Sequence, residues 1–335
     1  MRHISHFSCA AFALACCVLA ASPLFAQQGT PQKFKFRLDW KGGGQHALFY
    51  LGKQQGFYMD EGVDLEMYSG TGTSDSVKQV GIGAVDCALA DALVVVQAAE
   101  QRVPIKSIAA YYQTNPIVLM SPKEKPITEP RQLLSGIKLG TKKGSATYQG
   151  LIALLTANNI RLEDIKLVDI GFGVAPLLVG QVDAMMGFAT SEPVQAESKG
   201  MPIHLMPISD YGVDTYGLTM ICNSTSMERN PALMRAFLKA TQRAMQATIK
   251  DPAAGIAAVA RDVEAVDVVL EAKTLARAIS FWSNSETDAH GLGWQTLERW
   301  QRTIDVTRKL GLIEKPLRAE QLFTNAFFDS AAGAK

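Results

Sequence analysis

A carboxylate and a flat aromatic ring stand side by side at Asp39 and Trp40, directly after a strand-like run at residues 34–38. A carboxylate accepts hydrogen bonds from an amino group, and an indole ring offers an apolar wall to a planar ligand. The alternative is structural, with Asp39 capping a turn and Trp40 packing in a core. Because a polar, glycine-rich stretch follows Trp40, we favour ligand contact for this ring.

Two further segments combine hydroxyl groups with glycine at the predicted start of a helix. Backbone N–H groups at such a start, together with hydroxyls, suit an anion or a carbonyl group. Taken singly, each segment reads equally well as an ordinary helix cap. Their occurrence in corresponding positions of two halves favours binding, and Tyr148 would add a second aromatic face. The residues are Thr71, Gly72, Thr73 and Ser74 in one segment and Ser145, Ala146, Thr147 and Tyr148 in the other.

Three more titratable residues are candidates for the same site. Glu192 precedes Pro193 at a predicted helix start, where the helix dipole stabilises a carboxylate with or without a ligand. His46 stands among apolar residues and is either structural or part of a cleft. Asp91 is first of all a helix cap.

Other kinds of chemistry find little support in the sequence. We find no Gly-x-Ser-x-Gly elbow, no His-Glu-x-x-His pair and no phosphate loop. Cys87 and Cys222 lie in apolar, strand-like runs, so we predict two buried thiols rather than a disulfide, and no metal site. We therefore expect no catalytic residues and no cofactor.

The N-terminus predicts export. Arg2 precedes an apolar run at residues 7–21, and a small-residue exit follows with Ala26 in the cleavage position, which is typical of a signal peptide over residues 1–26. Lipid anchoring at Cys16 is less favoured, because cleavage there would fall inside the apolar run. No later segment approaches the ~20 apolar residues of a membrane helix.

The net charge and the length of the chain further narrow the kinds of protein to which it can belong. The chain has 335 residues and a formal charge of +1, which falls to about zero once the segment carrying Arg2 is removed. This balance offers no electrostatic footprint for nucleic acid. About three hundred mature residues fill two cores better than one, so we expect two lobes.

The elements that must position these residues follow an α/β order. Short β-branched runs alternate with helical patterns from residue 34 to about 208, which predicts largely parallel sheets with crossover helices. Amphipathic helices take over beyond Asn230-Pro231. We expect a first lobe over 27–118, a second over 119–215, and a return to the first lobe with C-terminal helices over 216–335. Crossing segments near 112–121 and 214–222 are the expected hinges.

Through an ordered series of short sequence motifs, the chain resembles a known family, the substrate-binding proteins of ABC importers for thiamine-pyrimidine precursors, alkanesulfonates and taurine. The resemblance covers essentially the whole mature chain. It implies a two-lobed periplasmic-binding-protein fold of type II, and in pyrimidine-binding members an acid and aromatic pair like Asp39-Trp40 faces the ligand. The motifs are Leu38-Asp39-Trp40, Gln45-His46-Ala47, Gly56-Phe57-Tyr58, residues 61–65, residues 70–74, residues 80–86 and Glu192-Pro193.

The resemblance implies a monomeric periplasmic protein that captures a small organic solute and delivers it to an inner-membrane permease with its cytoplasmic ATPase. The solute would be a pyrimidine-like heteroaromatic, or a sulfonate or carboxylate. Two alternatives stay open. Fungal enzymes of thiamine-pyrimidine synthesis share the superfamily, although they carry a cysteine-rich iron motif that this chain lacks. A sensory protein that presents its ligand to a receptor is the other.

Overall fold

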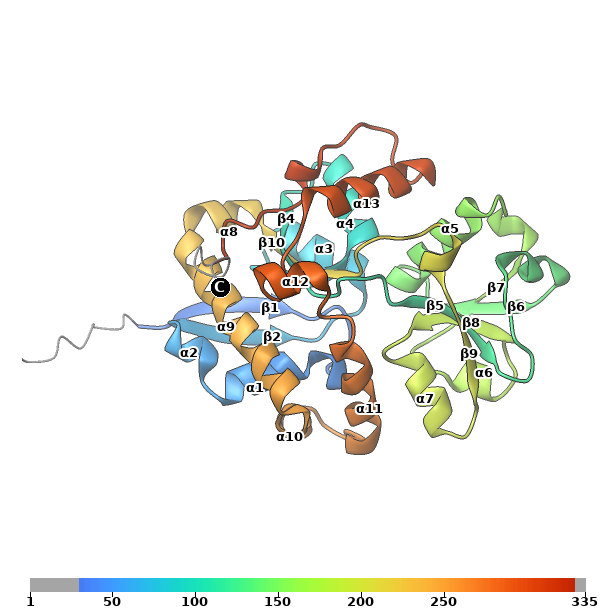
Figure 1. Ribbon diagram of the computed structural model, residues 1–335, viewed down its shortest axis with the longest axis horizontal. Helices are drawn as coiled ribbons and strands as arrows, with labels where there is room; N and C mark the ends of the chain where they lie inside the picture. The colour runs from blue at the N-terminus through green and yellow to red at the C-terminus, as the bar shows by residue number, and fades with distance from the viewer. Residues whose placement is uncertain (1–29, 329–335) are drawn as a thin grey trace, which may run out of the picture.

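The computed structural model describes residues 30–328, and Figure 1 shows two lobes joined by extended segments. The predicted signal peptide lies outside the described residues. Each lobe is built on a five-stranded sheet, with strand order β2-β1-β3-β10-β4 in the first and β7-β6-β8-β5-β9 in the second. The two-lobed α/β prediction is confirmed.

In the first sheet, β1, β2 and β3 are parallel, and the returning strand β10 runs antiparallel between β3 and β4. The carboxyl ends of the three parallel strands therefore lie at one edge. The strands are β1 (Gln32–Arg37), β2 (Val63–Tyr68), β3 (Cys87–Asp91), β4 (Ile105–Ala110) and β10 (Leu218–Asn223).

In the second sheet, β6 is parallel to both β7 and β8, while β5 is antiparallel to β8 and β9. Since β4 ends at Ala110 and β5 starts at Ile117, the chain crosses between the sheets over residues 111–116, and it returns before β10. The strands are β5 (Ile117–Pro122), β6 (Lys138–Thr141), β7 (Lys166–Asp169), β8 (Ala184–Phe188) and β9 (Ile203–Pro207).

Helices connect the parallel strands and start at the strand ends. Ser145 caps α5 by accepting the N–H of Tyr148, and Asp91 caps α4 as predicted, accepting the N–H of Leu93. Of the four residues expected at the start of α3, Gly72 is the cap, and Thr73 and Ser74 stand inside the helix. These helices are α1 (Ala47–Gln54), α2 (Phe57–Asp60), α3 (Thr73–Gly81), α4 (Ala92–Glu100), α5 (Ala146–Ala157), α6 (Ala175–Leu178) and α7 (Glu192–Ser198).

The helical tail packs mainly on the first lobe. Phe237 of α9 stacks on Phe34 of β1, with ring centroids 4.3 Å apart, and Trp300 of α13 joins the core around α4. Leu310, just beyond α13, is buried among residues of the second sheet, so the tail also touches the second lobe. The helices are α8 (Ser224–Arg229), α9 (Pro231–Lys250), α10 (Pro252–Asp262), α11 (Val268–Ile279), α12 (Ser285–His290) and α13 (Leu297–Lys309).

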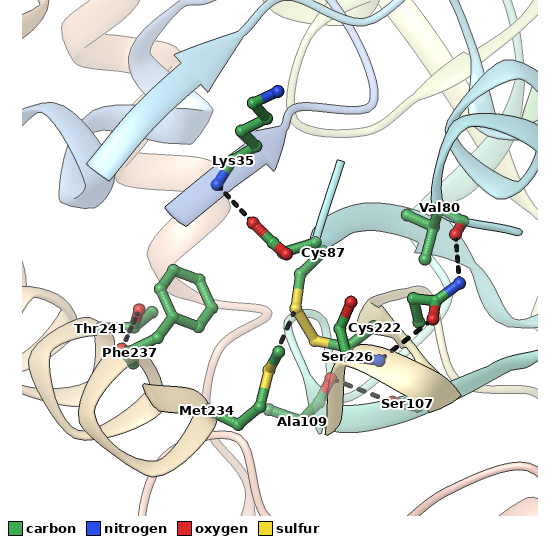
Figure 2. Close-up of a disulfide and its surroundings, with 12 residues drawn as sticks. Lys35, Val80, Cys87, Ser107, Ala109, Cys222, Ser226, Met234, Phe237 and Thr241 are labelled. Atoms are coloured by element: carbon green, nitrogen blue, oxygen red, sulfur yellow. Dashed lines mark hydrogen bonds between the residues drawn. A yellow bond between two sulfur atoms is a disulfide. The ribbon is translucent and has the colours of Figure 1, made fainter. Parts of the chain in front are cut away.

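The expectation of two free thiols is wrong. Cys222 of β10 pairs directly with Cys87 of β3 in the antiparallel register, and a disulfide joins them (Figure 2). The two residues are separated by 135 positions, and this register depends on how the chain returns from the second lobe. Both cysteines are fully buried, and the Sδ of Met234 lies 3.8 Å from the Cys87 Sγ.

Candidate functional site

The carboxyl ends of the parallel strands in both sheets open onto one cavity. This is where open α/β sheets bind ligands, because loops and helix starts converge there. The cavity, counted with the space that opens to solvent, measures about 600 Å³. Its lining comes from both lobes: Asp39, Trp40, Gln45, Gly72, Thr73, Lys142, Ser145, Ala146, Thr147, Ile170, Gly171, Gly173, Met185, Met186, Phe188, Ser191 and Glu192.

Asp39 follows β1 and reaches the cavity from the first lobe. The Nε2 of His46 donates to its Oδ1 over 2.9 Å, and both side chains are buried. The Oδ2 accepts no hydrogen bond from residues 30–328. The histidine thus fixes the carboxylate and leaves one oxygen for a donor in the cavity.

Gly72 brings the two lobes close together. Its N–H donates to the carbonyl of Asp39, and its φ of +132° lies in a region that side-chain-bearing residues rarely adopt. A Cβ at this position would meet the carbonyl oxygen of Gly144 in the second lobe at 3.3 Å. Glycine is therefore required here both for its backbone conformation and for the approach of the opposite lobe.

Hydroxyl groups line the second lobe's side of the cavity and are already linked to one another. The Oγ of Ser145 lies 2.8 Å from the Thr147 Oγ1 and donates to the carbonyl of Lys142 over 2.6 Å. Thr147 also contacts the Oγ1 of Thr141 at 3.2 Å. This network holds the start of α5 rigid against the cavity.

Glu192 enters from α7 and contributes a second carboxyl. Its Oε2 accepts the N–H of Phe188 over 2.8 Å. Burial raises the pKa of the Glu192 carboxyl, against the opposing effect of that hydrogen bond, and the nearby negative charge of Asp39 raises it further.

Asp91 lies behind the cavity wall. Its N–H donates to the Oγ1 of Thr73, which lines the cavity, and its own Oδ1 accepts from Leu93 over 3.0 Å. The Oδ2 is buried and unpartnered among the described residues. Burial, with a smaller contribution from Asp39, raises the pKa of the Asp91 carboxyl to about 7.

Several predicted residues do not line this cavity. His46 and Asp91 are buried behind it and support residues that do. Thr71 is exposed and donates to Asp75, and Ser74 points outward from α3. Tyr148 supplies only its N–H to Ser145. The others line it: Asp39, Trp40, Gly72, Thr73, Ser145, Ala146, Thr147 and Glu192.

Other lining residues were not predicted. Gln45 is buried beside His46, and Thr190 of the second lobe donates to its Oε1 over 3.5 Å. The rest directly follow β6, β7 and β8 or lie on β8 itself. Searching the end of every predicted parallel strand would have found most of them. They are Lys142, Ile170, Gly171, Gly173, Met185, Met186, Phe188 and Ser191.

Residues 30–328 contain neither a cluster of metal-ligand side chains nor a membrane-spanning helix. No three His, Cys, Asp or Glu side chains in this part of the chain gather as metal ligands would. No helix within the same range has both the length and the apolar character needed to cross a membrane.

Comparison with solved structures identifies the fold. The alkanesulfonate-binding protein SsuA from Xanthomonas axonopodis pv. citri, bound to MOPS, superposes with a TM-score of 0.66 at 14% identity over 88% of this chain and 99% of its own. The periplasmic nitrate-binding protein NrtA from Synechocystis PCC 6803 gives a TM-score of 0.61 at 14% identity over 91% and 93%. The predicted periplasmic-binding-protein fold is thereby confirmed.

Sequence relatives place the family. The riboflavin-binding protein RibY of Chloroflexus aurantiacus is 25% identical over 316 residues, 92% of this chain and 89% of its own. The formylaminopyrimidine-binding protein of Halalkalibacterium halodurans is 23% identical over 86% and 88% of the two chains. The 4-amino-5-hydroxymethyl-2-methylpyrimidine phosphate synthase THI5 of Saccharomyces cerevisiae is 26% identical over 66% and 68%. Residues 44–255 match the family model described as NMT1/THI5 like, and the chain belongs to this family.

Proposed function

We propose that this protein is the periplasmic solute-binding component of an ABC importer, and that its solute is a small nitrogen heteroaromatic with N–H donors. The observation that carries this proposal is the pair of carboxyls, Asp39 and Glu192, that face one cavity from opposite lobes. With Oδ2 of Asp39 unpartnered among the described residues, the site offers acceptors where a heteroaromatic amine has donors.

Apolar groups complete the complementarity. Trp40 and Phe188 are aromatic, and Met185 and Met186 are polarisable side chains that adapt to a flat ring. Relatives named for binding riboflavin and a formylaminopyrimidine support the same ligand class, since both compounds are nitrogen heterocycles. A sulfonate would instead face the Asp39 carboxylate, with Lys142 the only lysine or arginine of the lining.

Ligand capture would work by closure. Gly72 approaches Gly144 and Thr190 bonds Gln45 across the gap, so a bound solute contacts both lobes only when they are shut. Binding then shifts the population towards the closed form, which a membrane permease with its cytoplasmic ATPase would recognise.

Catalysis of the fungal type is the second candidate, because synthases belong among the relatives. Two observations speak for binding instead. Cys87 and Cys222 are joined to each other in the first sheet, away from the cavity lining, and cannot serve as free thiolate ligands. The relative with the widest coverage of this chain among those compared, at 92%, is named as a riboflavin-binding protein.

Thermal-shift screening followed by calorimetry tests the proposal. Formylaminopyrimidine, riboflavin, taurine and nitrate would be offered to the purified mature protein, since a ligand that binds the native state raises its melting temperature. We expect a heteroaromatic to raise it and to be recovered unchanged. A response to taurine or nitrate alone would overturn the ligand class, and conversion of the heteroaromatic would overturn the binding role.

A further inference from the structure

Phe172 occupies an unusual position for a large apolar side chain. It lies in the loop between β7 and α6, and its side chain is 41% exposed. Gly171 and Gly173 on either side of it line the cavity, and Gly173 has a φ of +82°. The loop therefore holds the phenyl ring at the edge of the cavity, where the ring is not packed in a hydrophobic core.

The ring contacts the opposite lobe instead. Its centroid lies 4.4 Å from that of Trp40, with an angle of 62° between the planes, which is an edge-to-face contact. Because Trp40 follows β1 and Phe172 follows β7, this contact exists only when the two lobes are together.

Two ammonium groups converge on the same ring, one from each lobe. The Nζ atoms of Lys41 and Lys142 both lie 4.8 Å from the centroid of Phe172. Neither lysine forms an ion pair with a carboxylate of residues 30–328. Closure brings these like charges together, and the negative face of an aromatic ring is a group that attracts both.

We infer that Phe172 is an aromatic clasp: it holds the closed form of the cleft against Trp40, Lys41 and Lys142, and it limits the rate at which a bound solute leaves. The clasp acts on the proposed binding site and so rests on the proposed function for its effect on solute release. Its effect on closure is independent of what the solute is.

Phe172→Ala in the full mature chain tests the clasp, with Phe172→Leu as a variant that keeps apolar bulk but lacks the ring. Stopped-flow fluorescence would follow release of riboflavin, and competition would follow formylaminopyrimidine. We expect Phe172→Ala to release the probe roughly five- to tenfold faster, with Phe172→Leu between it and the wild type. Val179→Ala is the matched control, because Val179 is an exposed apolar residue of the same lobe, 77% accessible and outside the cavity lining.

Small-angle scattering of the ligand-free proteins gives a second measurement that needs no ligand. The Phe172→Ala protein should have a larger radius of gyration than the wild type and Val179→Ala. If the wild type binds neither probe, the proposed ligand class is wrong. The comparison of the radii of gyration still tests whether Phe172 holds the two lobes together. Release rates and scattering equal to those of the wild type would overturn the clasp.

Discussion

Asp39 presents its two carboxylate oxygens to different surroundings. His46 binds Oδ1 from the buried side, and Oδ2 is left for a ligand. Asp39→Asn keeps the shape but removes the charge, and hydrogen bonds to charged groups contribute about 1.5–3 kcal/mol. We expect calorimetry to show affinity for the heteroaromatic falling by roughly 10- to 100-fold.

Asp305→Asn is the matched control for this measurement, because Asp305 is exposed on α13 and is not part of the cavity lining. Its affinity should equal that of the wild type. An Asp39→Asn protein that binds as tightly as the control would remove the carboxylate from ligand recognition.

Asp91 makes stability depend on pH in the direction opposite to a salt-bridged carboxylate. Its pKa is about 7 in the folded protein and about 4 in an unfolded chain, so between these values the native state binds a proton that the unfolded state lacks. The contribution of Asp91 to stability is therefore best below pH 4, declines as the pH rises to about 7, and is constant above that.

Asp91→Asn mimics the protonated form and can still accept the Leu93 N–H through its amide oxygen. Urea unfolding from pH 5 to pH 8 should show the variant gaining stability relative to the wild type as the pH rises to 7. Parallel curves for the two proteins across this range would contradict the assignment.

At the scale of elements, the start of α3 couples backbone conformation to closure. Gly72→Ala would force φ away from +132° and place a methyl group against Gly144, so we expect both a loss of stability of about 1–2 kcal/mol and weaker ligand binding. Gly83→Ala, beyond the other end of α3, shares the positive φ but has open space around it.

Measured by unfolding and by calorimetry, the two variants should separate the effect of backbone strain on stability from the effect of the contact with Gly144 on ligand binding. Gly83→Ala loses stability with unchanged affinity, and Gly72→Ala loses both. Equal affinities in the two proteins would mean that the approach of Gly72 to the second lobe has no part in binding.

Most elements could be predicted from local patterns, because cap residues such as Asn230 and alternating runs such as 63–67 carry their own signal. Strand β5 (Ile117–Pro122) was not predicted, because most of its residues fall in the crossing segment near 112–121 that was expected to act as a hinge. The site was predictable where glycine and hydroxyls cluster. Lys142 and Met185 could not be found that way, because only the sheet topology brings their strands to the edge that faces Asp39.

At the scale of the whole molecule, contacts between the lobes surround the cavity. Arg277 of α11 binds the carbonyl of Ala189 over 3.1 Å and the carboxylate of Glu197 over 2.8 Å in the second lobe. On α4 and α5, Gln97 and Gln149 meet at 3.5 Å. These polar contacts are partly exposed, so each stabilises closure only weakly and the lobes can separate to admit a solute.

The Cys87–Cys222 disulfide acts on the whole chain rather than on one lobe. It joins a strand that precedes the second lobe to one that follows it, and so closes a loop of 135 positions containing the entire second sheet. Restricting so long a loop in the unfolded state contributes about 4–5 kcal/mol in the chain-entropy view. The Cys87→Ala, Cys222→Ala double variant should unfold at a lower guanidinium concentration than the wild type. Its free energy of unfolding should be lower by about 4–5 kcal/mol.

Ligand affinity should be unchanged in the double variant, because neither cysteine lines the cavity. Adding a reductant during unfolding provides the internal control: it should lower the midpoint of the wild type towards that of the double variant and leave the variant unaffected. A wild-type midpoint insensitive to reductant would show that the two sulfurs are not joined, and the return of β10 to the first sheet would then depend on its hydrogen bonds and packing alone.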